Sequence, residues 1–152
     1  MSDRIERTVE LSAPVERVWR ALTDHHEFGR WFRVDLDSPF TVGRTTTGRM
    51  TYPGYEGVKW QAVVETMEAP RLFAFRWPHP ADPFADDPDA PTTLVEFRLS
   101  PGPGGTLLTI VESGFEALPG DRRAEAMRGN EGGWKEQAGN IKAHVEGSLA
   151  HS

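Results

Sequence analysis

Two charged residues, Arg7 and Glu112, fall where the alternation of their strands points inward, and they are the first candidates for chemistry. Arg7 is in step with the apolar residues on either side of it, and Glu112 is in step with Ile110, although Val111 would serve equally well on the inner side. If both side chains point inward, they can pair or can orient the polar end of a ligand, because a buried charge without a partner is costly. A structural salt bridge or a solvated strand edge are the alternatives.

Catalytic patterns are scarce in the rest of the chain. Acid–base chemistry by Glu112, with Tyr52 or Tyr55 as its partner, is an alternative that requires these groups to lie within hydrogen-bond reach of one another. The chain has no cysteine, no Gly-x-Ser-x-Gly turn and no glycine-rich loop that follows a strand and opens a helix. We therefore predict no catalytic residue and no cofactor, and an enzyme is the less favoured interpretation.

The five histidines do not have the spacing of a metal site. His25 and His26 are adjacent, so on a helix their side chains diverge and cannot chelate one ion as an i, i+4 pair does. No HxH or HxxxH spacing joins them to His79, His144 or His151. We predict no bound metal.

Residues 77–91 have the most unusual local composition, with five prolines and four aspartates. The aspartates do not have the spacing of a DxDxDG calcium loop, and no bidentate glutamate follows them. The prolines favour an extended, solvated connection between strands. A flap over the mouth of a pocket, with Phe84 as its apolar tip, is the alternative.

A set of large apolar residues, most of them aromatic, shares the inward side of the expected elements. In the functional interpretation these side chains line a pocket, since small-molecule sites are mostly apolar with a few fixed polar groups. In the structural interpretation they fill the core, and periodicity does not separate the two. The residues are Trp60, Phe75, Trp77 and Phe97 as walls on the sheet side, and Trp134 and Ile141 as the wall on the side of the last helix.

The elements that must position these residues begin with a strand and two short helices. Residues 5–11 alternate between apolar and polar types, which indicates a strand with one buried face. Pro14 suits the first position of a helix whose apolar residues, spaced three and four apart, share one face. Thr23 or Asp24 can cap a second short helical segment, in which the aromatic residues of 28–32 help to form the closed end of the domain.

The middle of the chain is patterned as β-structure. A short strand is expected over residues 38–42, and another over residues 44–52, in which Gly48 marks a bulge or a close approach by another segment. Residues 101–105 are rich in proline and glycine and predict a hairpin turn. The remaining strands are predicted from alternating apolar residues over 58–66, 73–77, 93–99 and 106–113.

The final element is predicted to be a long amphipathic helix that opens near Pro119. Trp134, Ile141 and the apolar residues that follow recur at helical spacing. Three glycines interrupt the pattern upstream, and each costs about 1 kcal/mol relative to alanine in a helix interior. We expect a break or kink in the segment 129–133.

Length and composition narrow the class of protein. The chain of 152 residues is expected to form a single domain over residues 1–152. Its net charge of −6 argues against nucleic acid or an anionic membrane as a partner. No apolar run is long enough to span a bilayer, the N-terminus lacks a signal-peptide core, and cysteine is absent, so the expected location is the cytoplasm.

The order of several short motifs resembles a known family. The chain is similar to the proteins related to the activator of heat-shock-protein-90 ATPase, within the START-like (SRPBCC) superfamily, over roughly residues 5–149. This resemblance implies an α+β helix-grip fold, in which a curved antiparallel sheet of six or seven strands surrounds a long C-terminal helix. Two short helices follow the first strand, and a pocket lies between sheet and helix. The motifs are Ala13-Pro14, Val18-Trp19, Trp31-Phe32, Gly105-Thr106, Glu112-Ser113-Gly114-Phe115 and Gly133-Trp134.

These observations together predict a domain that binds a small, largely apolar molecule in an internal cavity, as a monomer or a homodimer. Arg7 and Glu112 are the expected polar anchors, and the aromatic set forms the walls. One alternative is a protein-interaction module, such as a chaperone cofactor working through its surface. Another is an enzyme of the cyclase or hydrolase kind. The family name alone does not imply chaperone activation, because function belongs to a site and not to a fold.

Overall fold

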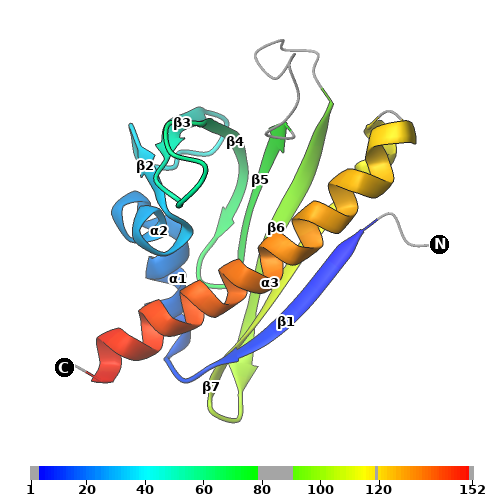
Figure 1. Cartoon of the computed structure of the whole chain (residues 1–152). Coiled ribbons are helices and arrows are strands. Elements are labelled where there is room, and N and C mark those ends of the chain that lie inside the picture. Colours follow the sequence, from blue (N-terminus) through cyan, green and yellow to red (C-terminus); the bar gives the residue numbers. More distant parts are fainter. Residues whose placement is uncertain (1–3, 79–90, 119, 151–152) are drawn as a thin grey trace.

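The computed structural model describes residues 4–78, 91–118 and 120–150, which form one antiparallel sheet and the helices that cover it (Figure 1). The strands are β1 (Ile5–Leu11), β2 (Val34–Leu36), β3 (Thr45–Met50), β4 (Lys59–Glu68), β5 (Leu72–Pro78), β6 (Thr92–Gly102) and β7 (Gly105–Ser113). The helices are α1 (Val15–Thr23), α2 (His25–Phe32), the short 3-10 helix η1 (Phe115–Ala117) and α3 (Gly120–Ala150).

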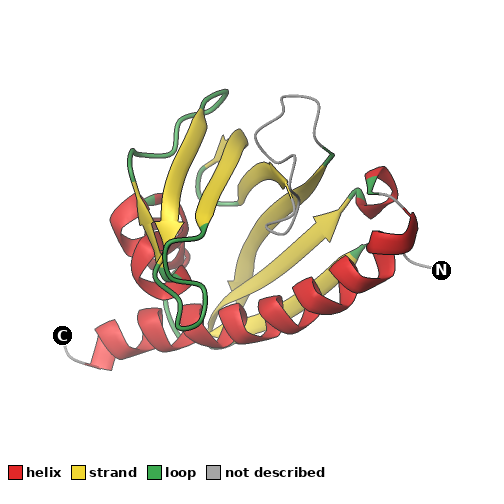
Figure 2. Cartoon of the chain, turned by 45° about the horizontal axis from the view of Figure 1, so that its top comes forward, coloured by secondary structure: helices red, strands yellow, loops and turns green. Residues whose placement is uncertain are grey.

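The seven strands follow the order β1-β7-β6-β5-β4-β3-β2, and every neighbouring pair is antiparallel. The sheet curves around α3, which crosses its concave side, while α1 and α2 cover one end (Figures 1 and 2). This is the helix-grip arrangement of the α+β class, so the fold expected from the resemblance is confirmed. The concave face of the sheet, α2 and α3 together enclose the core.

The two short helices form much as their residues predict. Val18, Ala21 and Leu22 are buried on one side of α1. Asp24 caps α2, because its side chain accepts hydrogen bonds from the backbone N–H groups of the first turn. Pro14 is the N-cap of α1 and not its first helical residue, a shift of one position.

One expected strand is wrong. Residues 38–42 form no strand, and the short strand β2 lies earlier, where Val34 is buried against the core. Phe40 is buried from within the loop, so its apolar side chain marked a core contact and not a strand. Gly48 does mark a close approach, because a Cβ atom there would lie 2.3 Å from the carbonyl oxygen of Asp35.

Of the break or kink expected in the last helix, the break is wrong, because α3 is helical without interruption over 31 residues. Tertiary contacts outweigh the low helix propensity of the glycines. Ala126 and Trp134 on either side of the glycine segment are buried, and Asn130 is held from the sheet by a hydrogen bond. Further along, the backbone N–H of Ser12 donates to Glu146, which fastens the second half of α3 to the end of β1.

Residues 79–90 lie outside the described residues. They include Phe84, the tip of the flap considered as an alternative, and the aspartates that lack the spacing of a calcium loop. Across the described chain, none of the helices combines the length and the apolar character needed to cross a bilayer.

Candidate functional site

The predicted wall residues lie in one buried cluster between the sheet and α3. Each of them is at most 8% exposed. β4, β5 and β6 supply the sheet side, and the inward positions that carry these side chains are buried. α3 supplies the opposite side. The six residues that the structure brings together here are Trp60, Phe75, Trp77, Phe97, Trp134 and Ile141.

The rings of this cluster are in direct contact. The indoles of Trp77 and Trp134 stack with their centroids 5.6 Å apart, which joins β5 to α3. Phe97 lies edge-on to Trp134 at 5.8 Å, and Trp60 lies edge-on to Phe75 at 5.7 Å. These are the offset and edge-to-face geometries that aromatic side chains prefer in well-packed interiors. A molecule that enters this region must therefore lie among the rings and shift some of them.

Glu112 is the polar centre of this interior. Its side chain is 0% exposed, and it faces inward together with Leu108 and Ile110. Oε1 accepts hydrogen bonds from the indole of Trp134 at 2.8 Å and from the side-chain amide of Asn130 at 3.0 Å.

The second carboxylate oxygen of Glu112 is equally well bonded. Oε2 accepts from the indole of Trp77 at 2.8 Å and from the hydroxyl of Thr93. Asn130 also reaches this oxygen, at 3.1 Å. The carboxylate thus connects β5, β6 and β7 to α3 through four uncharged donors, which occupy its lone-pair positions.

Arg7 shares the inner side of the sheet with Glu112 but is not paired with it. Arg7 stands opposite Ile110 in the ladder between β1 and β7, while Ile5 stands opposite Glu112. Its side chain is half-buried. Within the described residues no hydrogen bond or ion pair joins Arg7 to Glu112, so the structure brings them to the same face without a direct contact.

Sequence reasoning missed two of the four residues that bond Glu112. Thr93 keeps the inward alternation of Val95 and Phe97, so the parity of β6 already placed its hydroxyl inside. Asn130 precedes Trp134 by four residues and therefore shares its face of α3. Both signals are present in the printed sequence, but each residue type is usually solvated, which hid them.

A second polar cluster that the sequence did not suggest lies where α1, α2 and α3 meet. The carboxylate of Glu27 accepts hydrogen bonds from Arg17 at 2.6 Å and from Arg20 at 2.9 Å, and it lies 3.0 Å from Nε2 of His144. Burial by itself raises the pKa of Glu27. Hydrogen bonds from His144 and Arg17, with the charge of Arg17, outweigh burial and hold this pKa below its ordinary value of 4.5.

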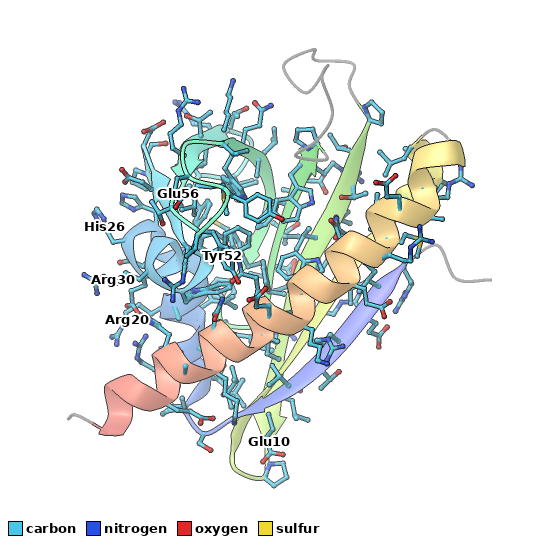
Figure 3. The ribbon with its side chains drawn as sticks, in the orientation of Figure 1. Glu10, Arg20, His26, Arg30, Tyr52 and Glu56 are labelled. Carbon is cyan, nitrogen blue, oxygen red and sulfur yellow. The ribbon has the colours of Figure 1, made fainter. Side chains whose placement is uncertain are left out.

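Tyr52, an alternative acid–base partner for Glu112, lies elsewhere. It belongs to the connection between β3 and β4 and lies over α3 (Figure 3). A hydrogen bond to the carboxylate of Glu136 raises the pKa of Tyr52. Within the described residues, no second titratable side chain is hydrogen-bonded to Glu112, so this arrangement does not assemble an acid–base pair.

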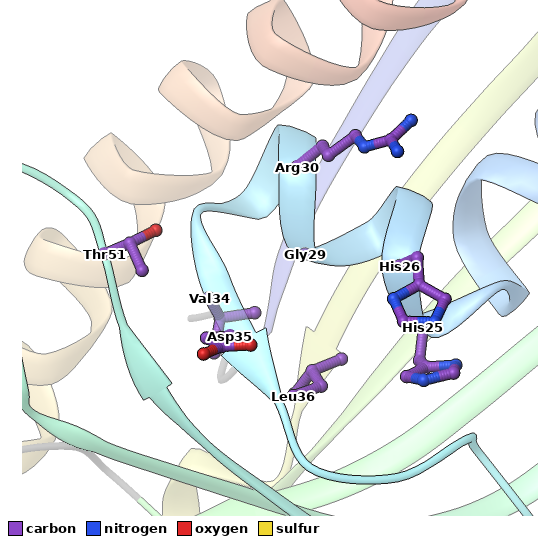
Figure 4. A pocket seen from close by; sticks show the side chains of 8 residues that line it. All are labelled: His25, His26, Gly29, Arg30, Val34, Asp35, Leu36 and Thr51. Atoms are coloured by element: carbon purple, nitrogen blue, oxygen red, sulfur yellow. The ribbon is translucent and has the colours of Figure 1, made fainter.

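A shallow hollow of about 250 Å³ opens on the surface between α2 and β2 (Figure 4). His25, His26, Asp35 and Thr51 contribute to its lining. His26 and Arg30 point away from the body of the molecule (Figure 3). The structure contains no group of three or more potential metal ligands in its described ranges. This hollow is open to solvent and separate from the aromatic interior.

Large exposed apolar side chains are few in the part of the chain that the structure describes. Val42 and Val63 lie where the loop before β3 pairs with β4, and Tyr55 and Val58 lie in the connection between β3 and β4. They belong to two stretches of the surface, and no helix or strand gathers them into one apolar face. The apolar rings of this protein are concentrated inside it.

Comparisons with known proteins agree with this fold. The model of the family described as "Activator of Hsp90 ATPase homolog 1-like protein" matches residues 12–146. No curated protein gives a significant match. Three solved structures show the similarity of fold.

The first is a protein from Mesorhizobium loti, with 24% identity and a TM-score of 0.74 over 94% of this chain and 96% of that one. The second, from Nitrosomonas europaea, has 20% identity and a TM-score of 0.77 over 99% of both chains. The third is the Aha1 dimer from Colwellia psychrerythraea, with 17% identity and a TM-score of 0.69 over 96% of this chain and 97% of that one.

Proposed function

The chain belongs to the activator of Hsp90 ATPase homolog 1-like family, and we propose that it binds a small, largely apolar molecule between its sheet and α3. The observation that carries this proposal is the placement of Glu112. A carboxylate with 0% exposure lies among aromatic rings and is held there by four uncharged donors. Such an interior combines an apolar lining with a few fixed polar groups, which is the composition of small-molecule sites.

The cost of burying Glu112 supports a role beyond stability. Taking a carboxylate out of water is expensive, and well-packed apolar side chains of similar volume often replace a buried ion pair without loss of stability. The burial of Glu112 inside a core of aromatic rings is therefore better explained by a role in ligand recognition. Its hydrogen bonds fix the indoles of Trp77 and Trp134, so Glu112 acts by orienting two walls of the proposed site.

Each predicted site residue has a role in the proposal. Trp60, Phe75, Trp77 and Phe97 form the sheet side, and Trp134 and Ile141 form the helix side. Arg7, half-buried on the inner side of β1, supplies a positive charge for a polar group at the outer end of the ligand. This role is weaker than that of the rings, because Arg7 is not part of the hydrogen-bonded centre.

We further propose the setting in which this domain works. The absence of cysteine and the net charge of −6 fit a single cytoplasmic domain that binds neither nucleic acid nor a membrane surface. Both a monomer and a homodimer are compatible with binding inside the protomer. The Aha1 structure from Colwellia psychrerythraea is a dimer, which makes the homodimer the first assembly to test.

The test compares a substitution that enlarges a side chain inside the proposed site with one that enlarges a side chain on the outer surface of the sheet. Phe97 is 0% exposed on the inner side of β6, and Val63 is 41% exposed on the outer side of β4. Binding of indanone, a flat bicyclic ketone, is measured by titration calorimetry for the wild type, for Phe97→Trp and for the control Val63→Trp. We expect Phe97→Trp to weaken binding about tenfold or more, beside the roughly 1–3 kcal/mol of stability that overpacking costs, and Val63→Trp to leave binding unchanged.

Two results would contradict this function. The first is the absence of binding of both indanone and its parent hydrocarbon, indane, to the wild type. The second is a loss of about 1–3 kcal/mol in Phe97→Trp with no change in affinity, which is the cost of overpacking a core that admits no guest. Native mass spectrometry of the purified protein provides a parallel readout, because a natural ligand adds mass to the folded chain and is released on denaturation.

A further inference from the structure

Two buried polar atoms in the aromatic interior have no hydrogen-bond partner. They are Nε1 of Trp60 and Oγ1 of Thr46, which are the buried side-chain atoms left unpaired among the described residues. Trp60 is 5% exposed and Thr46 is 1% exposed. Native proteins pair nearly all of their buried polar groups, and an unpaired one costs about as much as a lost hydrogen bond. Each of these two atoms therefore calls for a partner that the described residues do not supply.

The ladder between β3 and β4 makes these two residues neighbours. Thr46 stands opposite Ala62, and Trp60 stands opposite Gly48. Thr46, Gly48, Trp60 and Ala62 are the buried positions of their strands, so Thr46 and Trp60 are diagonal neighbours on the inner face. Diagonal side chains on an antiparallel pair lie within reach of long or aromatic groups.

In the described part of the chain, five aromatic rings surround the indole of Trp60. Phe28 and Phe32 of α2 lie 5.9 and 6.0 Å from its centroid. Phe40 lies at 6.5 Å, Phe75 at 5.7 Å and Trp77 at 6.0 Å. None of these rings can accept a conventional hydrogen bond from the indole of Trp60. The indole of Trp31 in the same core is different, because it donates to the carbonyl oxygen of Ala21 at 2.8 Å.

The space facing Gly48 is closed by the backbone of β2. A Cβ atom at Gly48 would lie 2.3 Å from the carbonyl oxygen of Asp35 and 3.1 Å from Cα of Leu36. No side chain can therefore reach over from position 48 to satisfy the indole opposite it. Among the described residues, the indole of Trp60 therefore has no hydrogen-bond partner.

From these observations we infer that the ligand of the proposed site carries an uncharged oxygen acceptor, such as a ketone, ester or ether oxygen, which Trp60 and Thr46 bind together. The indole N–H can only donate, and the threonine hydroxyl can donate in parallel. An anion is disfavoured, because all the aromatic neighbours of Trp60 are uncharged and a buried charge needs a partner. This inference rests on the proposed function and adds to it the polar feature that the ligand must have.

The experiment compares two probes that differ only in the oxygen. Indanone and indane share one bicyclic frame, and indane lacks the carbonyl. Affinities are measured for the wild type, Thr46→Val, Trp60→Phe and the control Trp31→Phe, which removes an indole that already has a partner. With two neutral hydrogen bonds available, the wild type is expected to bind indanone roughly tenfold more tightly than indane. Each of the two site variants should reduce this ratio to about threefold, and Trp31→Phe should leave it unchanged.

The indole N–H resonances give a readout that does not depend on affinity. The chain has five tryptophans, and the signal absent from Trp60→Phe assigns that residue. Indanone should shift the Trp60 N–H signal downfield, as a new hydrogen bond does, and indane should not. Thr46→Val keeps the shape of the side chain, so it tests the hydroxyl even if Trp60→Phe folds poorly.

The outcomes separate the two proposals. Equal binding of indanone and indane to the wild type, with the Trp60 signal unmoved by the ketone, would overturn the inference and leave the proposed function standing; a buried water would then be the partner of both atoms. Binding of neither probe would overturn both. A preference for indanone that survives in Thr46→Val and Trp60→Phe would place the oxygen elsewhere and would also overturn the inference.

Discussion

Glu112 shows how a single buried carboxylate can be satisfied without a positive charge. Its two oxygens accept hydrogen bonds from Trp77, Thr93, Asn130 and Trp134, which come from three separate elements. Hydrogen bonds to a charged acceptor are stronger than those between neutral groups. The hydrogen bonds from these four donors to residue 112 therefore require a carboxylate, and an amide of the same shape cannot accept all of them.

Glu112→Gln is expected to lower the free energy of unfolding by about 3 kcal/mol. The new amide N–H₂ would face an indole N–H or another donor, so a donor that is now paired would lose its acceptor. Urea denaturation of both proteins measures the difference. The control is Glu96→Gln. In the wild type, the carboxylate of Glu96 contacts Arg98 on the other face of the sheet. An ion pair at such a surface is worth less than about 1 kcal/mol. Equal effects of the two changes would contradict the central role of Glu112.

The unpaired hydroxyl of Thr46 makes an opposite prediction. Thr46→Val removes a buried polar atom that has no partner, so stability should stay the same or increase. Thr106→Val removes a hydroxyl that donates to the carbonyl oxygen of Ala13 at 2.7 Å, and it should cost about 1–2 kcal/mol. Thermal unfolding of the ligand-free proteins compares the pair. A loss in Thr46→Val as large as that in Thr106→Val would mean that the Thr46 hydroxyl has a partner.

At the scale of elements, the cluster around Glu27 links the closing helices to α3 and predicts a dependence on pH. The pKa of Glu27 is lowered in the folded protein, so its contribution to stability is fully present above the pKa of the unfolded chain. This contribution is lost as the pH falls below about 4.5 and through the folded pKa. We expect the wild type to lose more stability between about pH 6 and about pH 3 than Glu27→Gln does.

Denaturation in urea across this range checks the prediction for Glu27. Because Glu27 is paired with Arg17, Arg20 and His144, the variant starts from a lower stability near neutral pH, and the two curves should converge in acid. The control is Glu65→Gln, which disrupts an exposed ion pair with Arg76 on β5. Parallel curves for the wild type and Glu27→Gln would contradict the assignment.

The glycines of α3 offer a second test at this scale. A Cβ atom at Gly132 meets nothing within 4 Å, so Gly132→Ala should stabilise the protein by about 0.5–1 kcal/mol through better helix propensity. Gly105→Ala should do the reverse, because Gly105 has a φ of +144° and its Cβ would lie 2.6 Å from the carbonyl oxygen of Ala13. A rise in the midpoint of thermal unfolding for the first and a fall for the second is the expected pattern. A destabilised Gly132→Ala would indicate that the helix needs flexibility there.

Most elements could be predicted from the sequence, and the failures have physical causes. The alternation in β1 and β6 was informative because one face of each is more buried than the other. The strand expected over residues 38–42 was wrong because Phe40 is buried from within a loop, and its sequence pattern is the same as that of a buried strand residue. The uninterrupted α3 could not be predicted, since its glycine segment is held by contacts with the sheet and not by local preference.

At the scale of the whole molecule, the burial of the candidate wall residues in one cluster could be predicted from the sequence, and the hydrogen bonds of the polar groups only in part. The rings were found because aromatic residues at inward positions are easy to recognise. Thr93 and Asn130 were missed because each acts through Glu112, which comes from another element. Thr46 was missed because its significance is the absence of a partner, and only the arrangement of the neighbouring strands shows that absence.

The whole molecule has one organising feature: the curved sheet, α2 and α3 together bury a continuous cluster of rings around a carboxylate. We propose that this interior admits a small molecule. The most direct measurement is a crystal structure of the protein grown with indanone. We expect density for the ketone between the sheet and α3, with its oxygen within hydrogen-bond distance of Trp60 Nε1 and Thr46 Oγ1. Absence of the ketone from this interior, or its binding only at the surface, would contradict the proposal.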